Sequence, residues 1–285
     1  AGHSARNPIP IHSPHPNLPP KGEGDLYRCS HLPMPRFYCP LPLTAHAILD
    51  LPANAARHVQ VLRMQPGQSI ELFNGEGGAW QAEIVQMTRS GVQVRVGGAD
   101  AHDATERELA SPLHIAISLP ANERMDWLVE KATELGVASI TPLMSERSVL
   151  RLSTSAGDAR AEKKRSHWQA IAQGAAEQCG RNRLPAIAPV QTLDYWLKNR
   201  SQDEAAFVLS PPSADFQAKS LFQAVLPARA AHFLIGPEGG FSLAELQAAR
   251  AAGCTPCHLG SRVLRAETAP LYILAALAAR DLAAV

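Results

Sequence analysis

The chain has 285 residues, 46% of them hydrophobic and 19% charged, which is typical of a folded globular protein with room for two modest domains. The 27 Lys and Arg residues nearly balance 26 Asp and Glu residues, so a net charge of +1 excludes a whole-molecule field that attracts polyanions. The longest strongly apolar stretch, residues 271–279, is too short to span a bilayer. Because we find no secretory signal, and five scattered cysteines do not suggest a disulfide framework, we expect a cytoplasmic protein.

Residues 1–33 differ from the rest of the chain. They are rich in Pro, Gly, His and Ser and show no apolar periodicity. Such a segment cannot bury enough surface to offset the entropy lost on ordering. We therefore expect residues 1–33 to be a disordered or non-native extension, with Met34 as the natural start of the protein.

The next segment, residues 34–98, has the pattern of short strands. Residues 69–73 alternate apolar and polar side chains, Asn74-Gly75 is a turn signal, and the alternation continues in 80–85 and 92–96. Closely spaced strands with Gly turns predict a small β-barrel. The polar and charged residues 99–111 are interpreted as a linker.

From residue 112 to residue 285, short apolar runs alternate with helical patterns, which predicts an α/β domain with a mostly parallel sheet and helices on both faces. The expected strands are 113–118, 206–209 and 232–235. Two helices are expected from apolar stripes at 125–135 and 168–179, a third spans 243–252, and the last begins near Pro270. The helix 243–252 is the clearest element, because Ser242 and Glu245 fit a capping box and Phe241 and Leu246 fit a hydrophobic staple.

Cys254 and Cys257 have the CxxC spacing of a redox pair or of half a zinc site. No second pair of ligands is evident, and the motif follows a helix where a thioredoxin-like motif would precede one. We interpret the pair as two small residues at a turn entering a strand, and we expect no metal site in this protein.

Two neighbouring segments carry the features of a ligand site. The strand that ends at Ile235 runs into Gly236-Pro237-Glu238-Gly239-Gly240, and ligands in open α/β sheets bind outside the carboxyl ends of strands. This loop is neither a dinucleotide fingerprint nor a phosphate-binding P-loop, and a plain tight turn is an alternative. Residues 259–269 bring two arginines and a glutamate between a strand and the last helix, although a solvated surface loop would look similar.

Together, Gly236–Glu245 and Leu259–Ala269 resemble the signature of the RsmE family, the 16S ribosomal RNA (uracil-N3)-methyltransferases of the SPOUT superfamily. Further segments resemble the same family in the same order, from about residue 34 to the end of the chain: 35–38, 58–67, 130–137, 142–148 and 177–181. The resemblance implies an N-terminal PUA-like RNA-binding barrel and a C-terminal SPOUT domain with a trefoil knot. It also implies a homodimer formed through the C-terminal domain, S-adenosyl-L-methionine as methyl donor, and 16S rRNA of the small ribosomal subunit as partner.

The family's two glycine-bearing loops hold the cofactor, which gives a list of expected cofactor-binding residues here: Leu234, Ile235, Gly236, Pro237, Glu238, Gly239, Leu259, Gly260, Arg262, Val263 and Leu264. Methylation of uracil N3 requires a proton acceptor and a donor or cation that stabilises charge on the neighbouring carbonyl oxygens. Candidates for the second role are Arg181 and Arg265. Glu267 or Glu238 is the candidate base, although Glu267 is equally expected as a helix N-terminal carboxylate and Glu238 as a brace of its loop.

RNA contacts are expected from a local basic patch, since residues 160–183 hold six Lys and Arg residues against two Glu residues. The candidates are Arg36, His58, Arg63, Lys163, Lys164, Arg165, Arg181 and Arg183. A solvated helix face explains such a cluster equally well, and His58 could be a core residue. The alternatives to the RsmE function are a SPOUT enzyme with another target, such as a tRNA ribose 2′-hydroxyl, a non-catalytic RNA-binding protein, and a nicotinamide-dependent oxidoreductase, which the missing dinucleotide fingerprint disfavours.

Overall fold

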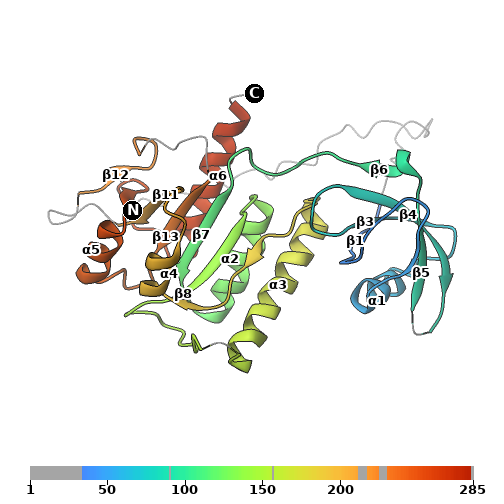
Figure 1. Cartoon of the computed structure of the whole chain (residues 1–285), viewed down its shortest axis with the longest axis horizontal. Coiled ribbons are helices and arrows are strands. Elements are labelled where there is room, and N and C mark those ends of the chain that lie inside the picture. The colour runs from blue at the N-terminus through green and yellow to red at the C-terminus, as the bar shows by residue number, and fades with distance from the viewer. Residues whose placement is uncertain (1–33, 90, 156, 211–216, 225–229, 284–285) are drawn as a thin grey trace, which may run out of the picture. The chain divides into compact units, whose positions relative to one another are not determined.

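The computed structural model describes residues 34–283 except 90, 156, 211–216 and 225–229 (Figure 1). The extension expected at residues 1–33 lies outside the described residues. Within the described part of the chain, we find no helix that is both long enough and apolar enough to cross a membrane.

The N-terminal domain is built on a six-stranded sheet in the order β1-β3-β4-β5-β2, with β6 paired to β4. Its strands are β1 (Arg36–Tyr38), β2 (Ile48–Asp50), β3 (Ser69–Phe73), β4 (Ala79–Met87), β5 (Val92–Val96) and β6 (His102–Asp103). The alternation seen in the sequence explains this sheet. Ile70 and Leu72 on β3, and Val92 and Val94 on β5, are buried in one apolar core, whereas the polar residues between them are only partly buried. The strands predicted at 69–73, 80–85 and 92–96 are therefore confirmed.

Two features of this domain differ from the sequence expectation. Helix α1 (Ala53–Val61) lies in a segment interpreted as strand-like, and it buries Ala55, Ala56 and Val59 against the sheet. The domain also extends beyond residue 98, because a 3-10 turn at Ala99–Ala101 leads into β6, which pairs with Ala79 and Trp80 of β4. Part of the expected linker is thus a strand of the N-terminal sheet.

The C-terminal domain contains an eight-stranded sheet in which every pair of neighbouring strands is parallel. The strand order is β10-β8-β7-β13-β11-β14-β12, with β9 paired to β8. The strands are β7 (Leu113–Ser118), β8 (Ser139–Met144), β9 (Ala186–Ile187), β10 (Gln191–Thr192), β11 (Ala205–Leu209), β12 (Lys219–Ser220), β13 (Ala231–Ile235) and β14 (Thr255–His258). The prediction of a mostly parallel sheet is confirmed.

Helices cover both faces of this sheet, as Figure 1 lets the reader follow. Helices α2 (Asn122–Glu134), α3 (Ala159–Cys179) and α6 (Thr268–Ala283) bury their apolar stripes in the core on one face. Helices α4 (Leu193–Asn199) and α5 (Leu243–Ala251) pack on the other face. Buried strands such as β13 are apolar on both sides because each face of the sheet meets a helix layer.

Local signals position two of these helices. The side chain of Ser242 accepts the Glu245 N–H while the Glu245 carboxylate accepts the Ser242 N–H, so the predicted capping box of α5 is present. Gly136 follows α2 with φ of +88°, a left-handed conformation that favours glycine at a helix end. Helix α6 begins at Thr268, slightly before the expected start near Pro270.

Candidate functional site

A cleft of about 640 Å³ opens at the carboxyl ends of three adjacent strands. Residues 236–240 after β13 form one wall, residues 259–266 after β14 form the other, and Leu209 and Ser210 at the end of β11 lie between them. In open α/β sheets this edge is where ligands bind, and the volume lies within the usual range for small-molecule sites. The two segments singled out in the sequence therefore fold into one cavity.

The first wall is a glycine-rich loop whose conformation requires glycine at two positions. The Gly240 N–H donates to the Pro237 carbonyl at 2.8 Å in a tight turn, and Gly240 has φ of +66°. At Gly236, an added Cβ would lie 3.1 Å from the backbone N of Phe241, closer than most real contacts. Since glycine has no side chain, Gly236, Gly239 and Gly240 contribute only main-chain atoms to the cavity wall.

The second wall turns sharply after β14. Gly260 has φ of +107°, and its N–H donates to Nδ1 of His258 at 3.1 Å. Further along, the carbonyl of Arg265 accepts the N–H groups of Thr268 and Ala269, which starts helix α6 directly behind the wall. The wall is thus a defined turn between a strand and a helix rather than a free surface loop.

Ten of the eleven residues expected to bind a cofactor line this cleft: Ile235, Gly236, Pro237, Glu238, Gly239, Leu259, Gly260, Arg262, Val263 and Leu264. Leu234 is not among the described residues that line it. Side chains alternate along a strand, so Leu234 points to the opposite face of the sheet, where it is fully buried against α4 and α5. Of the catalytic candidates, Arg265 and Glu238 line the cleft, and Glu267 lies just behind it.

An arginine that the sequence did not single out connects the first wall to Glu267, which lies behind the second wall. Arg124 of α2 donates from Nη1 to Glu238 Oε1 at 2.9 Å, and its Nε lies 3.7 Å from Glu267 Oε1. The Glu267 side chain is 8% exposed, and its Oε2 has no hydrogen-bond partner among the described residues. Arg124 follows the carboxyl end of β7 in the sequence, and this position could have indicated that it lies near the cleft. Its partners Glu238 and Glu267 are far away in the sequence, so the contacts themselves could not be predicted.

A third loop braces the glycine-rich wall. Arg147, in the loop after β8, donates from Nη1 to the Gly239 carbonyl at 2.9 Å. The neighbouring Glu146 N–H donates to Glu245 Oε1 at 2.8 Å, so the same loop contacts the cap of α5. Three loops at one edge of the sheet therefore hold the cleft in shape.

Arg181 is the main correction to the predicted site. It is not among the lining residues of the cleft, and its side chain is only 5% exposed. Its guanidinium forms an ion pair with Glu108 through two nitrogens and donates to the Thr133 carbonyl at 2.9 Å. All of its functional groups are engaged inside the protein, so Arg181 is a buried structural cation in this chain.

Arg36 is likewise corrected as an RNA-binding candidate. Its side chain is 10% exposed, forms an ion pair with Glu71, and donates to the carbonyl of Arg181 and to the side chain of Asn182. The guanidinium also stands 4.3 Å from the ring centroid of Phe73. Burial lowers the pKa of Arg36, and both terminal nitrogens of its guanidinium are engaged inside the protein.

The other RNA candidates lie at the surface to different degrees. Lys163 is exposed on α3, Lys164 and Arg165 are half-buried, and Arg165 pairs with Glu162 at 2.8 Å. Arg183 is exposed but donates to Glu106 at 3.0 Å and to the Glu76 carbonyl. His58 and Arg63 are exposed on the N-terminal domain, and the His58 ring packs edge-on against Phe37 with 5.3 Å between centroids.

The interpretation of Cys254 and Cys257 as structural residues is confirmed. Both are free and buried, Cys254 at the turn before β14 and Cys257 inside that strand. Burial raises the pKa of Cys257 to about 12 and also raises that of Cys254. Both thiols therefore stay protonated and buried, whereas a nucleophile or a metal ligand requires a thiolate.

Two family models match the chain. The model of an RNA methyltransferase domain matches residues 107–278, and the model of an RNA methyltransferase PUA domain matches residues 51–97. Together they account for most of the described residues.

Individual relatives show the same likeness. The Ribosomal RNA small subunit methyltransferase E of Bacillus subtilis is 34% identical over 224 residues, 77% of this chain and 84% of that protein. A crystal structure of the Neisseria gonorrhoeae enzyme of that name, bound to S-adenosyl methionine, is 34% identical with a TM-score of 0.78, covering 87% of this chain and 98% of that one. A Legionella pneumophila methyltransferase solved with S-adenosyl methionine is 33% identical, with the same TM-score and coverage.

Proposed function

This chain belongs to the ribosomal RNA small subunit methyltransferase E (RsmE) family, and from that membership we propose that it methylates N3 of a specific uridine in 16S ribosomal RNA. The methyl donor in this proposal is S-adenosyl-L-methionine, with which two relatives were crystallised. The observation that carries the proposal is the meeting of loops 236–240 and 259–266 in a single cleft at the carboxyl edge of the sheet.

The cleft fits such a cofactor in size and chemistry. Apolar side chains, among them Leu209, Leu246 and Leu264, offer surfaces for a flat heterocycle. The glycines of both walls allow polar groups of the ligand to approach the main chain. The sulfonium supplies an already activated methyl group, so the protein's own task is to position the acceptor and manage one proton.

Glu238 is assigned as the group that accepts the N3 proton, because it is the one carboxylate among the described residues that line the cleft. Its ion pair with Arg124 orients the carboxylate, and its side chain remains 28% exposed, so a substrate base can reach it. Glu267 is assigned a positioning role. It lies behind the wall at 8% exposure, and it contacts Arg124 rather than the cavity.

Charge that develops on the uracil carbonyl oxygens needs a cation in the cleft. Arg265 and Arg262 are both exposed and line the second wall, whereas Arg181 is buried elsewhere. We assign the stabilising role to Arg265, since the turn that starts α6 fixes its main chain through two hydrogen bonds.

The remaining parts of the proposal concern partners and topology. The PUA-like domain and the α/β methyltransferase domain expected from the resemblance are confirmed by the matches. Action on the assembled small subunit, homodimer formation through the C-terminal domain, a cytoplasmic location and the trefoil knot are proposed from family membership. A near-neutral net charge of +1 supports recognition of a folded particle by shape as well as by charge.

The test is methyl transfer from labelled S-adenosyl-L-methionine to small ribosomal subunits that lack the modification, followed by nucleoside analysis. We expect label in 3-methyluridine at one position. Label in a ribose 2′-O-methyl nucleoside of tRNA would indicate the alternative target, and cofactor binding absent in calorimetry would indicate a non-catalytic RNA-binding protein.

A further inference from the structure

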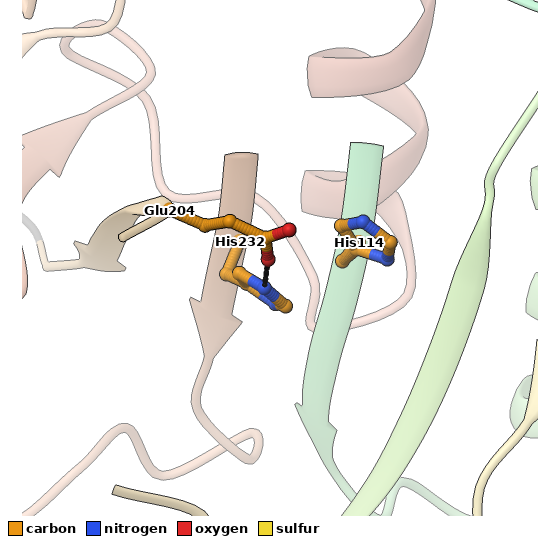
Figure 2. A group of neighbouring side chains, drawn as sticks. All are labelled: His114, Glu204 and His232. Atoms are coloured by element: carbon orange, nitrogen blue, oxygen red, sulfur yellow. Dashed lines mark hydrogen bonds and ion pairs between the residues drawn. The ribbon is translucent and has the colours of Figure 1, made fainter. Parts of the chain in front are cut away.

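Three potential metal ligands meet at the edge of the C-terminal sheet opposite to the cleft. His114 is the second residue of β7 and His232 the second residue of β13, and the two are register partners in neighbouring parallel strands. Glu204 immediately precedes β11, the strand on the other side of β13. Because register partners in parallel strands share a face of the sheet, both imidazoles and the carboxylate come together at the amino ends of three adjacent strands (Figure 2).

The side chains are arranged as a compact set. The imidazole rings stack with 4.6 Å between centroids and 21° between planes, and His232 Nε2 lies 2.5 Å from Glu204 Oε2. Figure 2 shows the carboxylate of Glu204 directed toward the two rings. One ligand atom of each residue lies within 4.8 Å of the ligand atoms of the other two.

We propose that His114, His232 and Glu204 bind a divalent transition-metal ion of the Zn²⁺ class, which fastens the amino ends of β7, β13 and β11 to one another. Two imidazoles and one carboxylate form a recognised zinc donor set, with the fourth position left for water. Hard cations such as Mg²⁺ and Ca²⁺ prefer oxygen ligands, so the two imidazoles select against them.

Neighbouring residues support the ligand geometry. Ser139 on β8 is the register partner of His114, and its Oγ lies 2.7 Å from His114 Nδ1. Metal-bound histidines usually have their second nitrogen held in this way, which leaves Nε2 of His114 as the ligand atom. Trp196 of α4 packs edge-on against the His232 ring, with 6.0 Å between centroids, and limits its rotation.

The distances require only a local adjustment. Bonds of about 2.0–2.1 Å place two ligand atoms of a tetrahedral site about 3.3 Å apart. The ligand atoms here lie within 4.8 Å of one another, and the closest printed pair, His232 Nε2 and Glu204 Oε2, is 2.5 Å apart, so metal binding must move this pair apart. Glu204 lies outside a strand and its side chain is 34% exposed, whereas His232 is 15% exposed. Because an imidazole binds a metal in the plane of its ring, closing the site requires the two stacked rings to turn toward a common point, together with a rotation of the Glu204 side chain. These are side-chain rotations, and the strands can keep their register.

The sequence predicts no metal site, and the fold shows why. Two of the donors lie on different strands and the third lies just before another strand, and the three show no ligand spacing along the chain. Only the parallel register brings them together. This inference does not depend on the proposed methyl transfer, because the cluster and the cleft lie at opposite ends of the strands.

The test is a titration of the metal-free full chain with Zn²⁺ by calorimetry and with Co²⁺ by visible absorption, on the wild type and on His232→Ala, Glu204→Gln and Ser139→Ala. Residues 1–33 contain further histidines, so the decisive quantity is the difference between variants rather than the total stoichiometry. The control is His167→Ala, which removes a surface histidine that pairs with one carboxylate, Asp126, at 2.9 Å.

We expect the wild type and His167→Ala to bind one equivalent that His232→Ala lacks, with a Co²⁺ absorption band that disappears in that variant. Glu204→Gln should weaken this equivalent by about 100-fold and Ser139→Ala by about 10-fold, as for ligand and supporting residues. Circular dichroism without metal checks that each variant is folded, and Ser139→Ala keeps all three ligands if His232→Ala fails to fold. Equal titrations of the wild type, Glu204→Gln and Ser139→Ala would overturn the proposal.

Discussion

Replacement of Arg181 by methionine separates a structural role from a catalytic one. The substitution keeps most of the side-chain volume but removes the ion pair with Glu108 and the hydrogen bond to the Thr133 carbonyl. It leaves the Glu108 carboxylate, which is 16% exposed, without its cation. Loss of one partner from such a buried pair costs about 3–5 kcal/mol.

This free energy translates into a large change in melting temperature. For a chain of 150–250 residues, 1 kcal/mol lowers Tm by about 2–4 °C, so we expect Arg181→Met to melt roughly 6–20 °C below the wild type. At a temperature where the variant is still folded, methyl transfer to small ribosomal subunits should stay within about threefold of the wild-type rate, because the side chain lies outside the cleft.

A second substitution tests the cause. Replacing both partners by apolar groups removes the uncompensated charge, so Arg181→Met/Glu108→Met should be more stable than Arg181→Met by at least about 1 kcal/mol. The measurements are thermal unfolding by calorimetry and single-turnover methyl transfer. A Tm within about 2 °C of the wild type, combined with a loss of transfer of 100-fold or more, would refute the structural assignment.

Further predictions concern the cleft and the RNA surface. Glu238→Gln should lower the rate of methyl transfer by about 10²–10⁴-fold, because a general base is lost. The cofactor affinity measured by calorimetry should stay within about threefold, because the pocket remains. An unchanged rate would point to another proton acceptor. Gly236→Ala should weaken cofactor binding by about tenfold or more, because its Cβ would press on Phe241 at 3.1 Å and shift the loop; wild-type affinity would show that the loop yields freely. Lys163→Ala/Lys164→Ala should weaken binding to ribosomal subunits and make the slope of log K against log salt shallower by roughly 1–2, measured by filter binding, and an unchanged slope would exclude these side chains from phosphate contact.

The fold could be predicted to the extent that it depends on local patterns. The alternation in residues 69–73 and 92–96 and the capping box at Ser242 depend on neighbours a few residues away, so the sequence displays them directly. Helix α1 was missed because its stripe, Ala55, Ala56 and Val59, is short and weakly apolar. Its burial is decided by the sheet below it rather than by its own periodicity.

The site shows the same division. Glycines after a strand end could be placed at the cleft because strand polarity determines which edge of the sheet they occupy. The burial of Arg181 could not be predicted, because its partners Glu108 and Thr133 are remote in the sequence. Nothing in the local sequence distinguishes a buried arginine from an exposed one. Arg124 was missed for the same reason, because Glu238 and Glu267 reach it only in the folded chain.

The anchoring of β1 has a consequence for the order of events during synthesis. The Tyr38 N–H donates to the Glu177 carboxylate at 2.9 Å, and Arg36 donates to Asn182, so the first strand of the N-terminal sheet depends on groups that leave the ribosome much later. Until the end of α3 and residue 182 have left the ribosome, β1 of the nascent chain lacks these partners, and Arg36 lacks its hydrogen bond to Asn182. We expect β1 to join the N-terminal sheet with its full set of hydrogen bonds only after residue 182 has left the ribosome, so this edge of the sheet is completed late in synthesis.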